Sequence, residues 1–306
     1  MKTVTECMKY VRSSMMLVLL AACGTANAAL PGPLVEGDWL QANKDKLDLV
    51  LIDVQEMPMF KRHHIPGSIS WPFSEWRTGD NTEPPKLLMP LDHLAERLSH
   101  LGVSADSPMV IVATGTGSGD LSASARVYWT LKVLGHEQVA ILNGGLVSYV
   151  NEYRGDFASG AGKARRKPVT YTASPNLDLL ATAEWLNDSS MVRLDARSLG
   201  EYIGLIAGPG ERPGTLPNAR HLPFDWLTEN SSGRLRPRGE LDRLFEHAGI
   251  AGQPAVHFCH TGNRAALTWF VDYALMGNRE ARLYDASMIE WGKKNELPID
   301  RKLDIN

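Results

Sequence analysis

The sequence contains little cysteine. Of its 306 residues three are cysteines, and two of these, Cys7 and Cys23, lie within the first 28 residues. Any domain formed by the rest of the chain therefore has Cys259 alone. Because a disulfide needs two partners, a disulfide-stapled fold is excluded and Cys259 is expected to be a free thiol.

The sequence also lacks a long hydrophobic run beyond its N-terminus and lacks an excess of either charge. A bilayer-spanning helix needs about 20 consecutive apolar residues, and no later segment approaches that length. Lys and Arg total 32 against 35 Asp and Glu, which gives a net charge of −3. This balance provides no electrostatic footprint for nucleic acid or for an anionic membrane, so neither is expected as a partner.

Metal-ligand spacing is absent as well. His63 and His64 are adjacent, but no cysteine or carboxylate stands near them at the spacing of a metal site. The pair precedes Ile65-Pro66 and is interpreted as a surface turn. No metal and no cofactor are expected.

Residues 1–28 have the composition of an export signal. A weakly basic start precedes the apolar run Met15–Ala22, which is too short for a mature membrane helix. Two cleavage patterns follow: Leu20-Ala-Ala-Cys23 has the form of a bacterial lipobox, which would lipidate Cys23, and Ala26-Asn-Ala28 suits an ordinary signal peptidase. We expect export to the bacterial periplasm, with a lipid anchor at Cys23 as one of two outcomes. A cytosolic protein with an apolar N-terminus is the alternative.

The remaining chain repeats itself once, at a period near 145–150 residues. Three landmarks recur in order with their internal spacing preserved, which predicts a duplicated domain. The copies are expected at residues 34–154 and 176–304, joined by a small, basic connector at 155–175 that is interpreted as solvated. The paired landmarks are Leu49–Asp53 with Met191–Asp195, Pro66 and Pro72 with Pro217 and Pro223, and Gly135–Asn143 with Gly277–Asp285.

Each copy alternates short apolar runs with segments of helical periodicity, which predicts an α/β fold with a mostly parallel sheet flanked by helices. The expected strands are 49–53, 109–114 and 139–142, then 191–194, 255–258 and 282–284. The expected helices are 90–101 and 122–134, then 181–186, 238–248 and 265–276.

Cys259 stands where one of these strands ends and a glycine-bearing loop leads into a helix. Backbone N–H groups of the loop and the helix dipole favour the thiolate there, so we expect a reactive, exposed sulfur. The alternative is an inert cysteine packed as a small hydrophobe. Active sites of open parallel sheets lie beyond the carboxyl ends of the strands, which is the position of Cys259.

Four motifs resemble the tandem-domain rhodanese sulfurtransferases, the thiosulfate and 3-mercaptopyruvate enzymes, over nearly the whole chain after the leader. They are Leu194-Asp-Ala-Arg197, Pro213–Pro217 with Pro223-Phe224, the loop Cys259–Arg264, and Tyr284–Gly292. The resemblance implies two rhodanese-like domains, of which the first is catalytically empty. It also implies that Cys259 carries sulfur as a persulfide.

The implied activity is transfer of a sulfane sulfur from thiosulfate to cyanide or a thiol acceptor. A 3-mercaptopyruvate donor and a non-enzymatic persulfide relay or binding module are the alternatives. N–H groups of residues 260–265 are expected to hold the anionic persulfide, and Gly262 allows the tight turn. Arg264 either braces the loop carbonyls or attracts the anionic donor. The cradle residues are His260, Thr261, Gly262, Asn263, Arg264 and Ala265.

Substrate or supporting roles are expected for Asp195, Arg197 and Glu201. The family often places a basic residue at the position of Glu201, four residues after the Arg of Asp-x-Arg, so an acid there is a departure. The loop residues His260-Thr261 match neither the thiosulfate nor the mercaptopyruvate pattern.

The first copy has Ala113-Thr114 where Cys259 would recur, and neither can hold a persulfide. A Cys-x-x-x-x-x-Arg phosphatase or arsenate reductase is the rival enzyme class. However, four residues separate Cys259 from Arg264 where that class has five, so the cradle is narrower.

Overall fold

The computed structural model describes residues 30–78, 87–162 and 166–303. The predicted leader with Cys7 and Cys23, and the connector residues Lys163 and Arg165, lie outside the described residues. Within the described part of the chain, no helix is long and apolar enough to cross a membrane.

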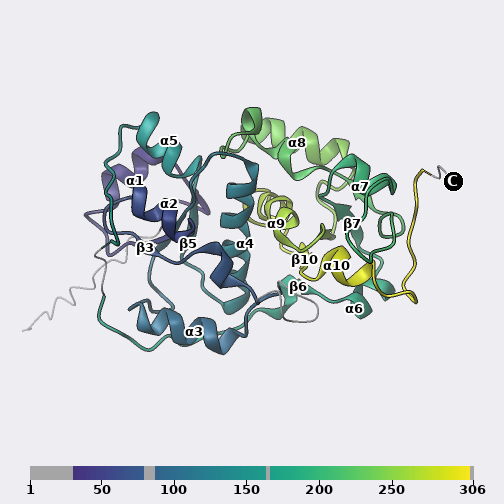
Figure 1. The fold of residues 1–306 in the computed structure, drawn as a ribbon, viewed down its shortest axis with the longest axis horizontal. Coiled ribbons are helices and arrows are strands. Elements are labelled where there is room, and N and C mark those ends of the chain that lie inside the picture. The colour runs from purple at the N-terminus through teal and green to yellow at the C-terminus, as the bar shows by residue number, and fades with distance from the viewer. Residues whose placement is uncertain (1–29, 79–86, 163–165, 304–306) are drawn as a thin grey trace, which may run out of the picture.

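The chain forms two α/β domains, each built on a five-stranded, wholly parallel sheet flanked by helices (Figure 1). The strand order is β1-β5-β4-β2-β3 in the first sheet and β6-β10-β9-β7-β8 in the second, so the two domains share one topology. This confirms the predicted fold class and the internal duplication.

The first domain contains β1 (Leu34–Val35), α1 (Gly37–Asn43), β2 (Val50–Asp53), α2 (Met57–Arg62), β3 (Ile69–Ser70), α3 (Leu91–His100), β4 (Met109–Val112), α4 (Ser118–Leu134), β5 (Val139–Leu142) and α5 (Gly145–Asn151). The second contains β6 (Leu180–Ala181), α6 (Ala183–Asp188), β7 (Val192–Asp195), α7 (Leu199–Ile203), β8 (Arg220–His221), α8 (Arg238–His247), β9 (Ala255–Phe258), α9 (Asn263–Phe270), β10 (Arg282–Tyr284) and α10 (Ser287–Trp291). Short 3-10 turns fill several connections.

Three expected helices differ from the prediction by more than one residue at an end, and the one expected at 122–134 begins at Ser118. The segment expected at 181–186 begins at Ala183, because Leu180–Ala181 first pairs with β10 as an edge strand. The segment expected at 265–276 begins at Asn263 and changes at Val271–Leu275 into a π-helical turn. Apolar periodicity does not distinguish these variants from a continuous α-helix.

Most described residues of the connector are exposed, as is His63, whereas His64 is buried. Ala158 pairs with His64, and Val169 donates its N–H to the carbonyl of Ser99, so the connector runs along the first domain. His64 is 2 % exposed, and its ring stacks on Phe60 at 4.0 Å between centroids. The surface-turn prediction is therefore wrong for His64. Stacking and a hydrogen bond to the Phe60 carbonyl offset the free-energy cost of burying its polar ring.

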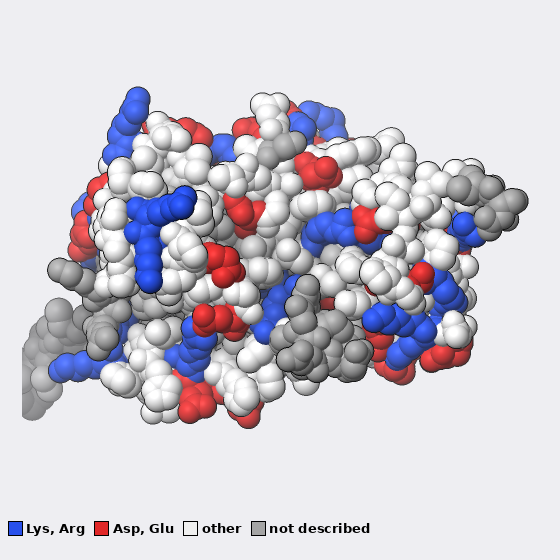
Figure 2. Space-filling view, in the orientation of Figure 1, with Lys and Arg blue, Asp and Glu red and all other residues white. Residues whose placement is uncertain are grey.

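Helix α4 of the first domain and α9 of the second lie side by side where the two domains meet (Figure 1). Almost every residue of α4 from Leu121 to Leu134 is buried, since one side covers its own sheet and the other faces the second domain. One apolar cluster contains residues of both domains, including Cys259. On the face drawn in Figure 2, basic and acidic side chains are intermixed.

Candidate active site

Cys259 follows the last residue of β9, and α9 begins four residues later. Gly262 turns the chain between them with a φ of +71°. A Cβ on Gly262 would lie 2.4 Å from Nη1 of Arg126 and 2.5 Å from the carbonyl oxygen of Asp285. Both the left-handed backbone and the close neighbours therefore require glycine at this position.

The loop presents its N–H groups inward and fixes its carbonyls outward. The carbonyls of Cys259 and His260 accept the N–H groups of Met288 and Ile289 at 3.1 and 2.9 Å. None of the N–H groups of residues 260–265 has an acceptor among the residues that the structure describes. Unpaired N–H groups on a glycine turn and a helix start are the donors that an anion cradle needs, and the cradle at residues 260–265 stays a prediction.

Cys259 is a free thiol with 0 % exposure, so the prediction of an exposed sulfur is wrong. The residue ends a central strand at the contact between the two domains, where apolar side chains of the shared cluster surround it. Its N–H donates to Oγ of Ser287 at 3.0 Å, and that hydroxyl donates to the carbonyl of Tyr284. Ser287 has a φ of +50°, a strained backbone for a residue with a side chain, directly beside the sulfur-bearing residue.

Arg264 is bound to Glu201 by two hydrogen bonds of 2.7 Å from its two terminal nitrogens. Burial alone would raise the pKa of Glu201, but the hydrogen bond and charge of Arg264 outweigh it and lower that pKa to about 2. Burial would lower the pKa of Arg264, whereas Glu201 and the negative charge of the Cys259 thiolate raise it. Arg264 therefore remains a cation beside the cradle.

This pairing changes the two roles expected for Arg264. Its guanidinium braces no loop carbonyl among the described residues, because Met288 and Ile289 occupy two of these carbonyls and the guanidinium of Arg77 holds the carbonyl of Thr261. Arg264 and Cys259 are close enough to interact through charge, but the carboxylate of Glu201 balances the guanidinium. Glu201 also forms a capping box with Ser198 at the start of α7, so one side chain both caps this helix and contacts the site.

Asp195 and Arg197 support the site from outside the cradle. Both are buried. The Arg197 guanidinium donates hydrogen bonds to both carboxylate oxygens of Asp195 and to the carbonyl of Gly214. Thr215 adds its hydroxyl to the same carboxylate at 2.8 Å. The pair therefore fixes the segment around Gly214, through Nε and one terminal nitrogen of Arg197.

His260 and Asn263 supply the polar side chains of the loop. Nε2 of His260 lies 2.7 Å from Oε1 of Glu211, whose side chain is 4 % exposed. Oδ1 of Asn263 is buried without a partner among the described residues, so it is free to accept a hydrogen bond from a ligand. No group of His, Cys, Asp and Glu suited to hold a metal ion occurs within the described ranges.

The first domain supplies groups to this loop that sequence reasoning did not identify. Besides Arg77, Arg126 of α4 forms a buried ion pair with Asp285, and its Nη1 lies against Gly262. The second oxygen of Asp285 accepts the N–H of Leu88 at 2.7 Å. The sequence offered one indication of this role, because Arg126 is a charged residue within a stretch of α4 made mostly of apolar and small residues.

The corresponding loop of the first domain borders a pocket of about 400 Å³ but has no cysteine. Ala113 stands at the position of Cys259, because Val112 and Phe258 end β4 and β9 in the same register and the carbonyls of Ala113 and Cys259 accept the N–H groups of Leu146 and Met288. Oγ1 of the next residue, Thr114, donates to the side chain of Gln55 at 3.2 Å. A Cβ on Gly115 would lie 1.9 Å from the carbonyl oxygen of Gly144, and the Gly115 carbonyl accepts the N–H of Gly233. The loop thus serves as packing against the second domain.

Comparison with known proteins agrees with this geometry. The family described as "Rhodanese-like domain" matches residues 36–152 and 180–294. A protein of Mycobacterium leprae named "Putative thiosulfate sulfurtransferase SseA" is 30 % identical over 287 residues, covering 89 % of this chain and 92 % of its own length. A Mycobacterium bovis protein, "Putative thiosulfate sulfurtransferase 1", is 31 % identical over 280 residues, covering 87 % of this chain and 97 % of its own.

Two solved structures share the fold. The 3-mercaptopyruvate sulfurtransferase SseA of Escherichia coli superimposes with a TM-score of 0.72 at 22 % identity, covering 84 % of this chain and 98 % of its own. The anaerobic ergothioneine biosynthesis enzyme of Chlorobium limicola gives 0.77 at 18 % identity, covering 89 % and 71 %. At these identities the likeness concerns the fold alone.

Proposed function

We propose that this chain, which belongs to the family of rhodanese-like domain proteins, transfers a sulfane sulfur from thiosulfate to cyanide or a thiol through a persulfide on Cys259. The observation that carries the proposal is the row of unpaired N–H groups at residues 260–265 after the only cysteine of the two domains. Relatives that align over almost their whole length bear thiosulfate sulfurtransferase names.

The reaction requires one nucleophile and one anion cradle. The Cys259 thiolate attacks the outer sulfur of thiosulfate, the S–S bond of the donor breaks, and sulfite leaves with the electron pair. The terminal sulfur of the resulting persulfide is anionic and lies within reach of the loop N–H groups, which stabilise it without a metal. Cyanide then attacks that sulfur, and thiocyanate leaves while the thiolate is restored.

Access to the sulfur requires a local movement. Cys259 is 0 % exposed, so a donor reaches it only after neighbouring side chains shift. The Arg264–Glu201 pair is well placed to respond, because an incoming anion competes with Glu201 for the guanidinium. A donor that carries more charge gains more from Arg264 but is repelled more strongly by Glu201.

That balance favours 3-mercaptopyruvate as the second candidate donor. At neutral pH its carboxylate carries one charge, whereas thiosulfate carries two. With Glu201 ionised and bound to Arg264, the singly charged donor meets less repulsion at the site.

The deciding experiment is the mass of the purified protein after exposure to thiosulfate. We expect the gain of one sulfur atom, removable by cyanide, and no gain in Cys259→Ser. The same variant is expected to lose thiocyanate formation entirely while its unfolding midpoint stays near that of the wild type. Sulfur gained by the variant, or turnover that survives in it, would refute the persulfide mechanism.

Export to the bacterial periplasm is part of the proposal, with Cys23 as the candidate lipidated residue. Support comes from the short apolar run Met15–Ala22 and the Leu20-Ala-Ala-Cys23 motif. Cell fractionation of the wild type and Cys23→Ala tests both points. A membrane-bound wild type with a soluble periplasmic variant supports the anchor, and a periplasmic protein in both cases supports cleavage after Ala28. A cytoplasmic protein would contradict export.

A further inference from the structure

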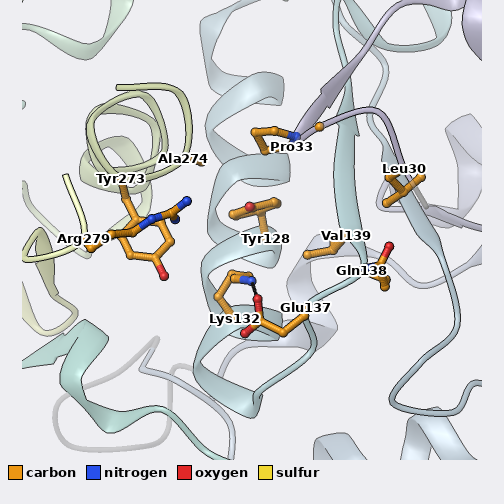
Figure 3. A pocket seen from close by; sticks show the side chains of 11 residues that line it. Leu30, Pro33, Tyr128, Lys132, Glu137, Gln138, Val139, Tyr273, Ala274 and Arg279 are labelled. Atoms are coloured by element: carbon orange, nitrogen blue, oxygen red, sulfur yellow. Dashed lines mark hydrogen bonds and ion pairs between the residues drawn. The ribbon is translucent and has the colours of Figure 1, made fainter. Parts of the chain in front are cut away.

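A cavity of about 460 Å³ lies between the two domains, away from the catalytic loop (Figure 3). Helix α4 of the first domain lines it with Tyr128 and Lys132, and the second domain supplies Tyr273 and Arg279. None of its lining residues belongs to the cradle. Tyr273 stands ten residues beyond Asn263, which corresponds to about 15 Å along a helix.

The two tyrosines are buried but leave their hydroxyl groups unused. Tyr128 is 4 % and Tyr273 is 8 % exposed, and neither hydroxyl has a hydrogen-bond partner in the described part of the chain. Neither oxygen is among the fully enclosed orphan atoms, so both open toward the cavity. Both hydroxyls are therefore available to donate hydrogen bonds to a ligand at this cavity.

The charge in the cavity is positive. The Arg279 guanidinium lies over the ring of Tyr273 at 4.7 Å from its centroid, extends toward Tyr128, and has no ion pair among the described residues (Figure 3). Lys132, nearly buried, is neutralised by Glu137. The guanidinium donors and the two phenol groups therefore face the cavity without an anion.

Both phenols can act as donors in this setting. Burial, together with the neighbouring Tyr273, raises the pKa of Tyr128 well above its usual range, so its proton is retained. On the opposite wall Leu30, Pro33 and Val139 offer apolar surface. The cavity thus has a cationic, hydrogen-bonding end and an apolar end.

We propose that this interdomain pocket binds a small organic carboxylate. The carboxylate accepts hydrogen bonds from Arg279 and from the hydroxyls of Tyr128 and Tyr273, and its hydrocarbon part packs on the apolar wall. Charge-assisted hydrogen bonds are the stronger class and give this recognition its selectivity for an anion, with the exposed Arg279 at the mouth of the pocket and the two buried tyrosines inside it. The bound molecule would join α4 to the turn that follows α9.

Titration calorimetry with benzoate tests the pocket, with benzamide as the uncharged probe of the same shape. Benzoate is expected to bind the wild type and benzamide is not. Arg279→Gln should weaken benzoate by about 10- to 100-fold, the effect of losing a charge-assisted hydrogen bond. Tyr128→Phe, which keeps the ring against Phe270, should weaken it several-fold.

Arg282→Gln is the matched control. It removes the same charge from an arginine that stacks on Trp185 at 4.6 Å, outside the pocket. Benzoate affinity unchanged in Arg282→Gln and lost in Arg279→Gln supports the proposal. No binding of benzoate to the wild type, equal binding of benzamide, or full affinity in Arg279→Gln would each overturn it. Because the readout is binding, a failure here leaves the sulfur-transfer proposal untouched.

Discussion

Replacing Arg126 by methionine is expected to destabilise the protein more than any surface change, although this residue lies in the catalytically empty domain. Arg126 is fully buried, forms an ion pair with Asp285 of the other domain and lies 4.6 Å from the ring centroid of Trp129. Methionine keeps most of the side-chain volume. The change therefore removes the charge and the hydrogen bond to Asp285, together with Nε and Nη1, which have no partner among the described residues, without opening a large cavity.

The magnitude follows from the partner that is left behind. Asp285 is 5 % exposed and would retain only the N–H of Leu88 as a donor to its carboxylate oxygens. Breaking a buried pair by removing one member costs about 3–5 kcal/mol, since the other charge stays buried. If the unpaired charge of Asp285 causes the destabilisation, Arg126→Met should lower the free energy of unfolding by only about 1–2 kcal/mol when it is made in the Asp285→Asn variant.

Urea unfolding measures the free energy, and Arg97→Met is the matched control. Arg97 also pairs with a carboxylate, that of Glu75, and also lies over a tryptophan, Trp71 at 4.4 Å, but its side chain is 39 % exposed. An exposed pair is worth at most about 1 kcal/mol, so the control should change little.

Activity gives a second readout for Arg126→Met. Because Nη1 packs against Gly262, the loop loses a neighbour, and turnover should fall more than the Michaelis constant rises. A free energy of unfolding within about 1 kcal/mol of the wild type would refute the reasoning about buried charge.

The remaining predictions concern the loop and two carboxylates. Glu201→Gln keeps the helix cap and removes the negative charge that balances Arg264, so the Michaelis constant for thiosulfate should fall several-fold in steady-state kinetics, and Glu201→Arg should lower it further; unchanged constants would show that Glu201 does not affect the donor. Gly262→Ala should abolish turnover, because its Cβ meets Arg126 and a backbone oxygen; normal rates would contradict the cradle geometry. Burial raises the pKa of Asp53 to about 6 despite two hydrogen bonds from Gln55. The folded protein therefore holds the proton more tightly than the unfolded chain, and this contribution to stability is full below about pH 4 and lost as the pH rises through 6. Asp53→Asn cannot ionise, so urea unfolding should show a smaller loss of stability between about pH 4 and pH 7 than in the wild type; an equal loss would mean that another group titrates.

Sequence periodicity predicted the fold well because each strand is a short apolar run and each copy repeats the same order. The loop that forms the candidate cradle could also be predicted from the sequence, since Cys259 and Gly262 lie in one contiguous segment. The burial of Cys259 could not be predicted, because it depends on α4, more than 120 residues earlier in the chain. The partner of Arg264 was missed for a similar reason: Glu201 was noted as a departure, but only tertiary structure brings the two side chains together.

Asp195 and Asp53 show that equivalent positions in the two copies of the repeat can have different electrostatic surroundings. Both end equivalent strands, yet Asp195 is held by Arg197, whereas Asp53 has the neutral Gln55 at the matching place. The sequence shows this difference, but its effect appears only once burial is known. A neutral partner leaves the first carboxylate desolvated without a compensating cation.

The burial of α4 has a consequence for the history of this chain. A gene shortened to its catalytic half would encode a domain whose α9 face, including Trp269 and Phe270, meets water in place of α4. Such a product is expected to aggregate before it can be selected for activity. The first domain is therefore expected to remain necessary for solubility although its own loop contains no cysteine.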